Sequence, residues 1–98
     1  MQTASAESLY QIIPSYPLPV PHLNGTGRET LLREYREAHQ ALDAFAMALH
    51  RVTCHGRDYY LAGADALQEA KASRTKIFDL LDEIDSYLED HIRHLSNA

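Results

Sequence analysis

The sequence predicts an all-α protein, an antiparallel hairpin of two long helices preceded by an extended proline-rich N-terminal arm. Two observations predict the hairpin: apolar residues recur at intervals of three and four over two separate stretches, and a short connection containing glycine lies between them. Long helices joined by a short loop pack antiparallel. A third observation predicts the arm, since all four prolines lie within eight residues near the N-terminus.

The predicted arm covers residues 1–25, and the helical hairpin covers residues 26–98. Proline fixes φ and biases the preceding residue to extended geometry, so residues 14–23 are expected to be polyproline-like. Apolar residues between Leu9 and Leu23 make the arm too hydrophobic for an ordinary linker. We therefore expect it to lie on its own helical body or on a neighbouring subunit, and a partner-binding tail is the alternative.

The first helix is predicted over residues 27–54. Thr26 and Glu29 have the spacing of a capping box, with Thr26 as the N-cap. Gly56 is the predicted stop signal of this helix. The apolar positions follow the repeat of a heptad seam; they are Leu31, Tyr35, Ala38, Leu42, Phe45, Leu49 and Val52.

The second helix is predicted over residues 65–95, with Asp65 as the N-cap and Gln68 three residues later. Its stripe is wider than one partner helix can cover, and small chains with a thin core need help from association. We therefore expect a helical-bundle oligomer, most simply a dimer; the monomeric alternative folds the arm along the hairpin. The stripe consists of Leu67, Ala70, Arg74, Ile77, Leu81, Ile84, Leu88, His91 and Leu95, widened by Phe78, Leu80, Tyr87 and Ile92.

Two seam positions are polar, Arg74 and His91. An antiparallel register places Arg74 level with Phe45 and near Asp43. A polar residue in a seam fixes register and oligomeric state at some loss of stability, so Arg74→Leu is expected to raise stability or change the oligomeric state. The alternative is an inward arginine that holds an anionic ligand in the central cavity of an oligomer.

Composition excludes several classes of protein. Ninety-eight residues allow one small domain, and nine Lys and Arg against fourteen Asp and Glu give a net charge of −5, which disfavours binding to duplex nucleic acid. A single cysteine excludes an internal disulfide and indicates a reducing compartment. The N-terminus lacks a signal-peptide pattern, and no apolar run approaches the roughly 20 residues of a membrane span. A cytoplasmic location is expected.

The connection over residues 55–64 carries the candidate binding residues: His55, Arg57, Asp58, Tyr59 and Tyr60. A planar guanidinium binds phosphate or carboxylate, and phenol rings stack on bases or on side chains of a partner. The alternative is a structural loop, in which Asp58 caps a turn and the two tyrosines cover the open end of the hairpin. Of the two, Tyr60 is expected to turn inward.

The run from His55 to Tyr60, followed by Gly63 and flanked by helices rich in alanine and leucine, resembles a pattern in short helical proteins of proteobacterial phages and prophages. The resemblance covers about residues 30–95 and leaves out the arm. It assigns no role to any residue. It implies an accessory protein, in the host cytoplasm if phage-encoded, that acts without catalysis by occupying a host or defence component.

The sequence predicts neither an enzyme nor a cofactor, because nothing pairs a nucleophile or an acid and base in an enclosed pocket. It predicts no metal site either: His50 with Cys54, and His91 with His94, have ligand spacing but lie at opposite ends of the hairpin. The leading hypothesis is a protein-interaction module that docks through the arm, the loop or the acidic face of the second helix. That face consists of Asp79, Asp82, Glu83, Asp85, Glu89 and Asp90. The alternative is an oligomer that sequesters an anionic, nucleotide-like molecule through the loop.

Overall fold

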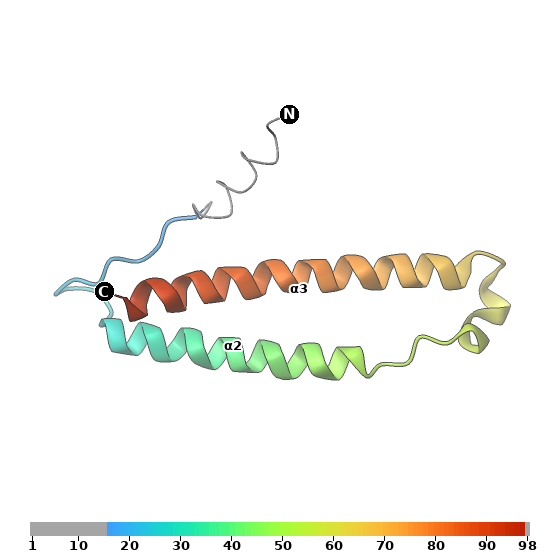
Figure 1. Ribbon diagram of the computed structural model, residues 1–98, viewed down its shortest axis with the longest axis horizontal. Coiled ribbons are helices and arrows are strands. Elements are labelled where there is room, and N and C mark those ends of the chain that lie inside the picture. The colour runs from blue at the N-terminus through green and yellow to red at the C-terminus, as the bar shows by residue number, and fades with distance from the viewer. Residues whose placement is uncertain (1–15, 98) are drawn as a thin grey trace, which may run out of the picture.

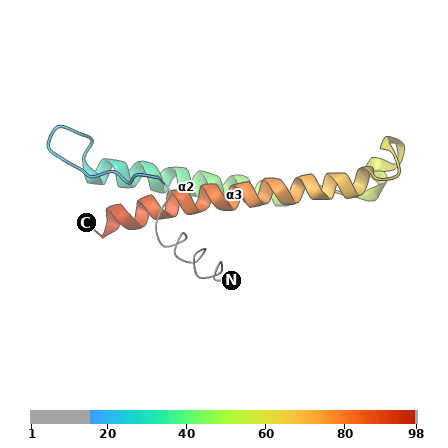
Figure 2. The same ribbon diagram turned by 90° about the horizontal axis from the view of Figure 1, so that it is seen from above.

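The computed structural model describes residues 16–97, which form two long antiparallel helices joined by a shorter helical turn (Figure 1). The order of elements is α2 (Arg28–His50), the 3-10 helix η1 (Gly56–Ala62) and α3 (Ala66–Ser96), with no strand among these residues. The predicted all-α hairpin is confirmed, and α2 and α3 lie side by side in both views (Figure 2). Residues 1–15, most of the predicted arm, and Ala98 lie outside the described residues.

The start of α2 differs from the predicted capping box. The N-cap is Gly27, whose carbonyl accepts the N–H of Leu31 at 3.0 Å, and no side chain caps this end. Thr26 was therefore the wrong N-cap, because it lies one residue too early to reach the free N–H groups of the first turn. Glu29 lies in that first turn, where its carboxylate interacts favourably with the positive end of the helix dipole.

The end of α2 also differs, since the helix stops at His50 and not near residue 54. The N–H groups of Arg51 and Val52 bond to the carbonyls three residues earlier, which tightens the last turn. Arg74 of α3 donates from Nη2 to the carbonyl oxygens of Leu49, at 3.1 Å, and His50, at 3.0 Å. The guanidinium of Arg74 thus bonds to carbonyl groups that a further turn of α2 would otherwise satisfy.

The second helix matches its prediction to within one residue at each end. Asp65 occupies the N-cap position, although its side chain makes no capping bond, and its carbonyl accepts the N–H of Glu69 at 3.0 Å. Thirty-one residues correspond to about 46 Å of helix at 1.5 Å per residue. Within the described residues, no helix combines the length and the apolar character needed to cross a bilayer.

The most buried part of the molecule lies in the last turns of α3, at Leu88, His91 and Leu95. His91 is only 2% exposed, and its Nδ1 lies 2.7 Å from the carbonyl oxygen of Tyr87, to which an Nδ1–H would donate. Its ring stacks on Tyr35, with centroids 4.5 Å apart, and also contacts the rings of Tyr87 and Tyr16. The polar seam position at His91 is therefore satisfied inside an aromatic cluster.

Residues 16–21, here called the strap, run along the C-terminal part of α3. The hydroxyl of Tyr16 donates to the carboxylate of Asp90, and His94 Nε2 donates to the carbonyl oxygen of Pro19 at 2.7 Å. Burial, followed by the hydrogen bond to Asp90 and the negative charge of Asp90, raises the pKa of Tyr16 to about 12. The strap thus adds the Tyr16 ring to the cluster around His91.

Candidate functional site

The loop between the helices is held by its backbone and by one histidine. His55 is the N-cap of η1, and its Nδ1 accepts the N–H of Arg57 at 3.1 Å. The N–H of Asp58 bonds to the carbonyl of His55 at 3.0 Å. Gly63 ends η1 with φ of +122°, a conformation that side chains with a Cβ rarely adopt. Asp58 is therefore not the cap of this turn; His55 is.

The backbone and His55 order the loop, and most of its other side chains face the solvent. Arg57, Asp58 and Tyr60 are exposed, and Tyr60 retains 76% of its accessible surface. Within residues 16–97, none of these three side chains takes part in a hydrogen bond or an ion pair. A rigid turn that presents a guanidinium, a carboxylate and a phenol is suited to contact with another macromolecule.

The two tyrosines point the opposite way from the prediction. Tyr59 is half-buried, whereas Tyr60 projects outward beside Leu61, which is fully exposed. The expectation that Tyr60 turns inward was wrong. Successive residues of a 3-10 helix point in different directions, and of the two tyrosines only Tyr59 is partly covered. Leu61, which sequence reasoning passed over, belongs with Tyr60 to the exposed apolar tip of the loop.

Arg74 lies elsewhere than predicted. It ends α2 from the opposite helix and places its guanidinium carbon 5.5 Å from the centroid of the Phe78 ring. Asp43, its expected neighbour, pairs instead with His39. A hollow of about 510 Å³ adjoins Arg74, but its Nη2 already donates to carbonyl groups. Arg74 thus caps a helix end, and it does not present the pair of free N–H donors that bidentate binding of an anion requires.

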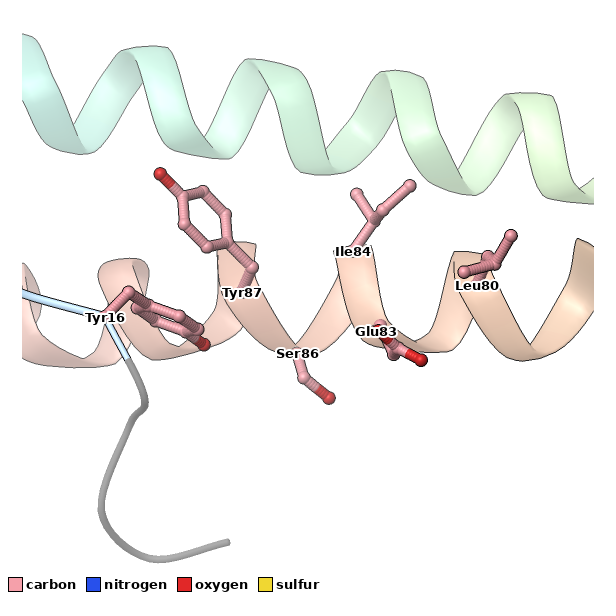
Figure 3. A pocket seen from close by; sticks show the side chains of 6 residues that line it. All are labelled: Tyr16, Leu80, Glu83, Ile84, Ser86 and Tyr87. Atoms are coloured by element: carbon pink, nitrogen blue, oxygen red, sulfur yellow. The ribbon is translucent and has the colours of Figure 1, made fainter. Parts of the chain in front are cut away.

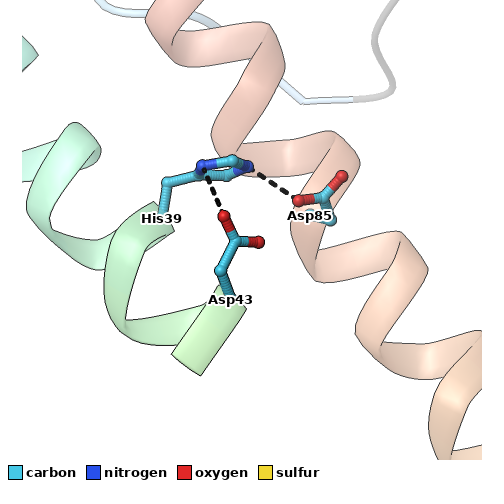
Figure 4. Close-up of side chains that lie close together, drawn as sticks. All are labelled: His39, Asp43 and Asp85. Atoms are coloured by element: carbon cyan, nitrogen blue, oxygen red, sulfur yellow. Dashed lines mark hydrogen bonds and ion pairs between the residues drawn. The ribbon is translucent and has the colours of Figure 1, made fainter. Parts of the chain in front are cut away.

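A histidine that the sequence analysis did not single out bridges the two helices (Figure 4). His39 Nε2 lies 2.7 Å from Asp85 Oδ1 and 3.7 Å from Glu89 Oε2, while Nδ1 lies 3.8 Å from Asp43 Oδ2. The sequence signal for this cluster is a pair of i, i+4 spacings. His39 and Asp43 have this spacing on α2, and Asp85 and Glu89 have it on α3.

The same cluster contains the residues best placed to hold a metal ion. The ligand atoms of His39, Asp43 and Asp85 lie within 4.8 Å of one another. Metal ligation requires bonds of about 2.0–2.2 Å to one ring nitrogen, whereas here each nitrogen faces a different carboxylate (Figure 4). The arrangement fits a network of hydrogen bonds between the helices, which becomes an ion-pair network when the imidazole is protonated, better than a cation site.

The histidines considered for metal binding from sequence each have another partner. The His50 ring stacks on Phe78, with centroids 4.0 Å apart. His91 and His94 bond to the carbonyls of Tyr87 and Pro19, respectively. Cys54 is half-buried and forms no disulfide. The structure does not bring these residues together into one site.

An apolar stripe on α3 is left uncovered. Ile77, Leu80, Ile84 and Tyr87 are between 39% and 52% exposed and follow one another at intervals of three, four and three. Leu80, Ile84 and Tyr87 project from one side of α3, and Tyr16 of the strap lies beside Tyr87 (Figure 3). These side chains line an open groove of about 680 Å³. The wide stripe predicted from sequence is only partly used by contact with α2.

Comparisons of the chain with protein-family models, with curated proteins and with solved structures found no match. The resemblance of the run from His55 to Tyr60 to phage and prophage proteins therefore stays a prediction, as does the role of each loop residue. Among the exposed apolar side chains, those at the tip of the loop and in the stripe on α3 form the surfaces considered below.

Proposed function

We propose that this chain is a non-enzymatic helical interaction protein whose docking surface is the tip of the loop. The observation that carries the proposal is the exposure of Tyr60 next to a fully exposed Leu61 on an ordered turn. Tyrosine and arginine are enriched at the centres of protein interfaces, where a rigid ring adds contact area at little entropic cost. Arg57 supplies a polar contact beside this apolar pair.

The geometry favours a protein partner over a small anionic ligand. Small-molecule sites bury about 70–90% of the ligand surface in a concave pocket. The side chains of Arg57, Tyr60 and Leu61 project outward from a convex turn, which suits a partner that brings its own concave surface. A nucleotide-like ligand, bound through Arg57 and the tyrosines of several subunits, is the alternative.

In the same proposal the chain is a homo-oligomer that occupies a component of a host or of a defence system. Support for association comes from the uncovered apolar stripe on α3. Support for a host partner comes from the resemblance of the loop motif to phage and prophage proteins. Several loop tips on one assembly would raise the effective affinity for a partner with repeated sites.

The test compares the parent chain with the double variant Tyr60→Ser, Leu61→Ser as baits in a proteobacterial lysate. We expect a protein that the parent captures and the double variant loses, with equal helicity and equal mass of the two baits. Met47→Ser is the matched control, because it removes an exposed apolar side chain from α2 and should keep the captured protein. A melting temperature that rises with added nucleotide, and fails to rise in Arg57→Ala, would instead support the anionic ligand.

A further inference from the structure

We propose that the stripe of Ile77, Leu80, Ile84 and Tyr87 is the face through which two copies of this chain associate, with their α3 helices antiparallel. This inference rests on the proposed homo-oligomer and assigns its interface and its symmetry. The occupant of the groove is a second copy of the same stripe, related by a two-fold axis near Leu80.

The hairpin alone covers little of its own surface. Within the described residues, only Leu88, His91 and Leu95 are buried. A second copy would supply the missing contacts.

The spacing of the stripe is that of a helix–helix seam. Intervals of three, four and three place the four side chains in a row about 15 Å long, at 1.5 Å of rise per residue. Leu80, Ile84 and Tyr87 project on the side of α3 that faces α2 (Figure 3), yet the row stays about half-exposed, so it lies at the flank of the intramolecular contact. Two hairpins joined along this flank make a four-helix bundle, the arrangement in which each helix gains a second neighbour.

The charges beside the stripe select the antiparallel arrangement. Lys76 precedes Ile77 and Glu83 precedes Ile84, so both charges lie along the same edge of the row. Both side chains are exposed, and within residues 16–97 neither one forms an ion pair. Opposite charges flanking a helical seam determine the orientation of the partner.

A two-fold axis near Leu80 reverses the direction of the second helix. It places Lys76 of one copy beside Glu83 of the other, and the same pair forms again on the opposite side of the axis. Ile77 then faces the second copy's Ile84. A parallel arrangement would instead place the corresponding flanks of the two rows on opposite sides of the seam, so that Lys76 of one copy could not reach Glu83 of the other.

The experiment measures the mass of the full-length chain by light scattering and sedimentation at micromolar concentration. We expect twice the chain mass of 11.1 kDa. Lys76→Glu should weaken the dimer roughly tenfold, since two attractive pairs become repulsive. The exchange variant Lys76→Glu, Glu83→Lys should restore it. Lys71→Glu is the matched control, because it makes the same charge change on α3 away from the stripe and should leave the mass unchanged.

A second variant tests the apolar row itself. Leu80→Asp places two carboxylates at the two-fold axis and should yield a monomer. Because Leu80 is half-exposed in the hairpin, its helical circular dichroism should match that of the parent.

Three results would overturn the proposal. The first is a parent chain of 11.1 kDa, and the second is a dimer that neither Lys76→Glu nor Leu80→Asp weakens. The third is an intrachain disulfide between Ile12→Cys and Leu80→Cys in a Cys54→Ser background, which would show that the N-terminal segment occupies the stripe. None of these measurements involves a partner protein, so the failure of this interface is separate from failure of docking at the loop.

Discussion

Arg74 donates to the carbonyl oxygen of His50 at 3.0 Å and thereby ends α2 with a side chain from α3. The same guanidinium nitrogen reaches the carbonyl of Leu49 and the group lies over the Phe78 ring. Because the last carbonyls of a helix have no partner within it, this contact stabilises a helix end and fixes the register of the two helices at one point.

We therefore expect Arg74→Leu to lower the free energy of unfolding by about 1 kcal/mol, the scale of a lost hydrogen bond. This reverses the expectation from sequence, which treated Arg74 as a register residue that a leucine could improve upon. Chemical denaturation of the parent and the variant provides the measurement. Lys71→Leu, on the same helix, is the control and should change stability by less. A more stable Arg74→Leu would restore the original interpretation.

The helices themselves were predictable from sequence, but their ends at the loop were not. The three-and-four spacing of apolar residues depends only on the helical repeat, so it predicted α3 to within a residue. Gly56 looked like a stop signal, yet α2 had already ended at His50 because Arg74 reaches it across the hairpin. A contact between residues 24 positions apart leaves no local signal.

The candidate site was likewise predictable from sequence only in part. Composition alone marked the loop as unusual, and the structure leaves Arg57 and Tyr60 exposed there. The role of His55 as a cap depends on the φ and ψ of the turn, and the choice between Tyr59 and Tyr60 depends on which side of a 3-10 helix meets α3. The His39 network needed the pairing of α2 with α3 before it could be seen.

The strap should detach in strong alkali. Because a phenol is neutral when protonated, a pKa raised from 10.0 to about 12 means that the folded protein holds the Tyr16 proton more tightly than the unfolded chain. The stabilisation is complete below pH 10 and is lost as the pH rises toward 12. Burial, followed by its interaction with Tyr87, also raises the pKa of Tyr35.

A titration of tyrosinate absorbance measures this effect. We expect a late-ionising component in the parent, and Tyr16→Phe should reduce it while leaving the contribution of Tyr35. Tyr60→Phe is the control, because it removes a phenol that projects into solvent and should leave the late component intact. If Tyr16→Phe titrates with an unchanged late component, the hydrogen bond to Asp90 does not hold the strap in solution.

With the imidazole protonated, the ion-pair network at His39 should make a small contribution to stability that depends on salt. Asp85 accepts the shortest contact, at 2.7 Å, but both side chains are partly exposed. We expect Asp85→Asn to lower the free energy of unfolding by about 1 kcal/mol or less at low salt. At about 1 M salt the Debye length falls to about 3 Å, so the difference should shrink.

Thermal unfolding at two salt concentrations provides this measurement. Asp79→Asn makes the same change at an exposed carboxylate of α3 with no ion pair among residues 16–97. It should have no effect at either salt concentration. A loss of stability in Asp85→Asn that is equal at both would show that a hydrogen bond, and not charge, stabilises this contact.

Of the glycines in the loop, Gly63 should be the one at which a side chain lowers stability most. Its φ of +122° lies where residues with a Cβ are strained, although the space around it is open. Holding such a residue in a sparsely populated backbone region costs on the order of 1–3 kcal/mol. We therefore expect Gly63→Ala to lower stability by that amount, or to unwind η1 locally and weaken docking at the loop tip.

Gly56→Ala is the matched control, because its φ is not positive and the added carbon would lie 3.5 Å from a Leu67 methyl group, an ordinary contact. Denaturation midpoints of the two variants, compared with amide hydrogen exchange over residues 55–64, make the test. Equal stability and equal protection in both variants would mean that the backbone of the loop is not held at Gly63 as described.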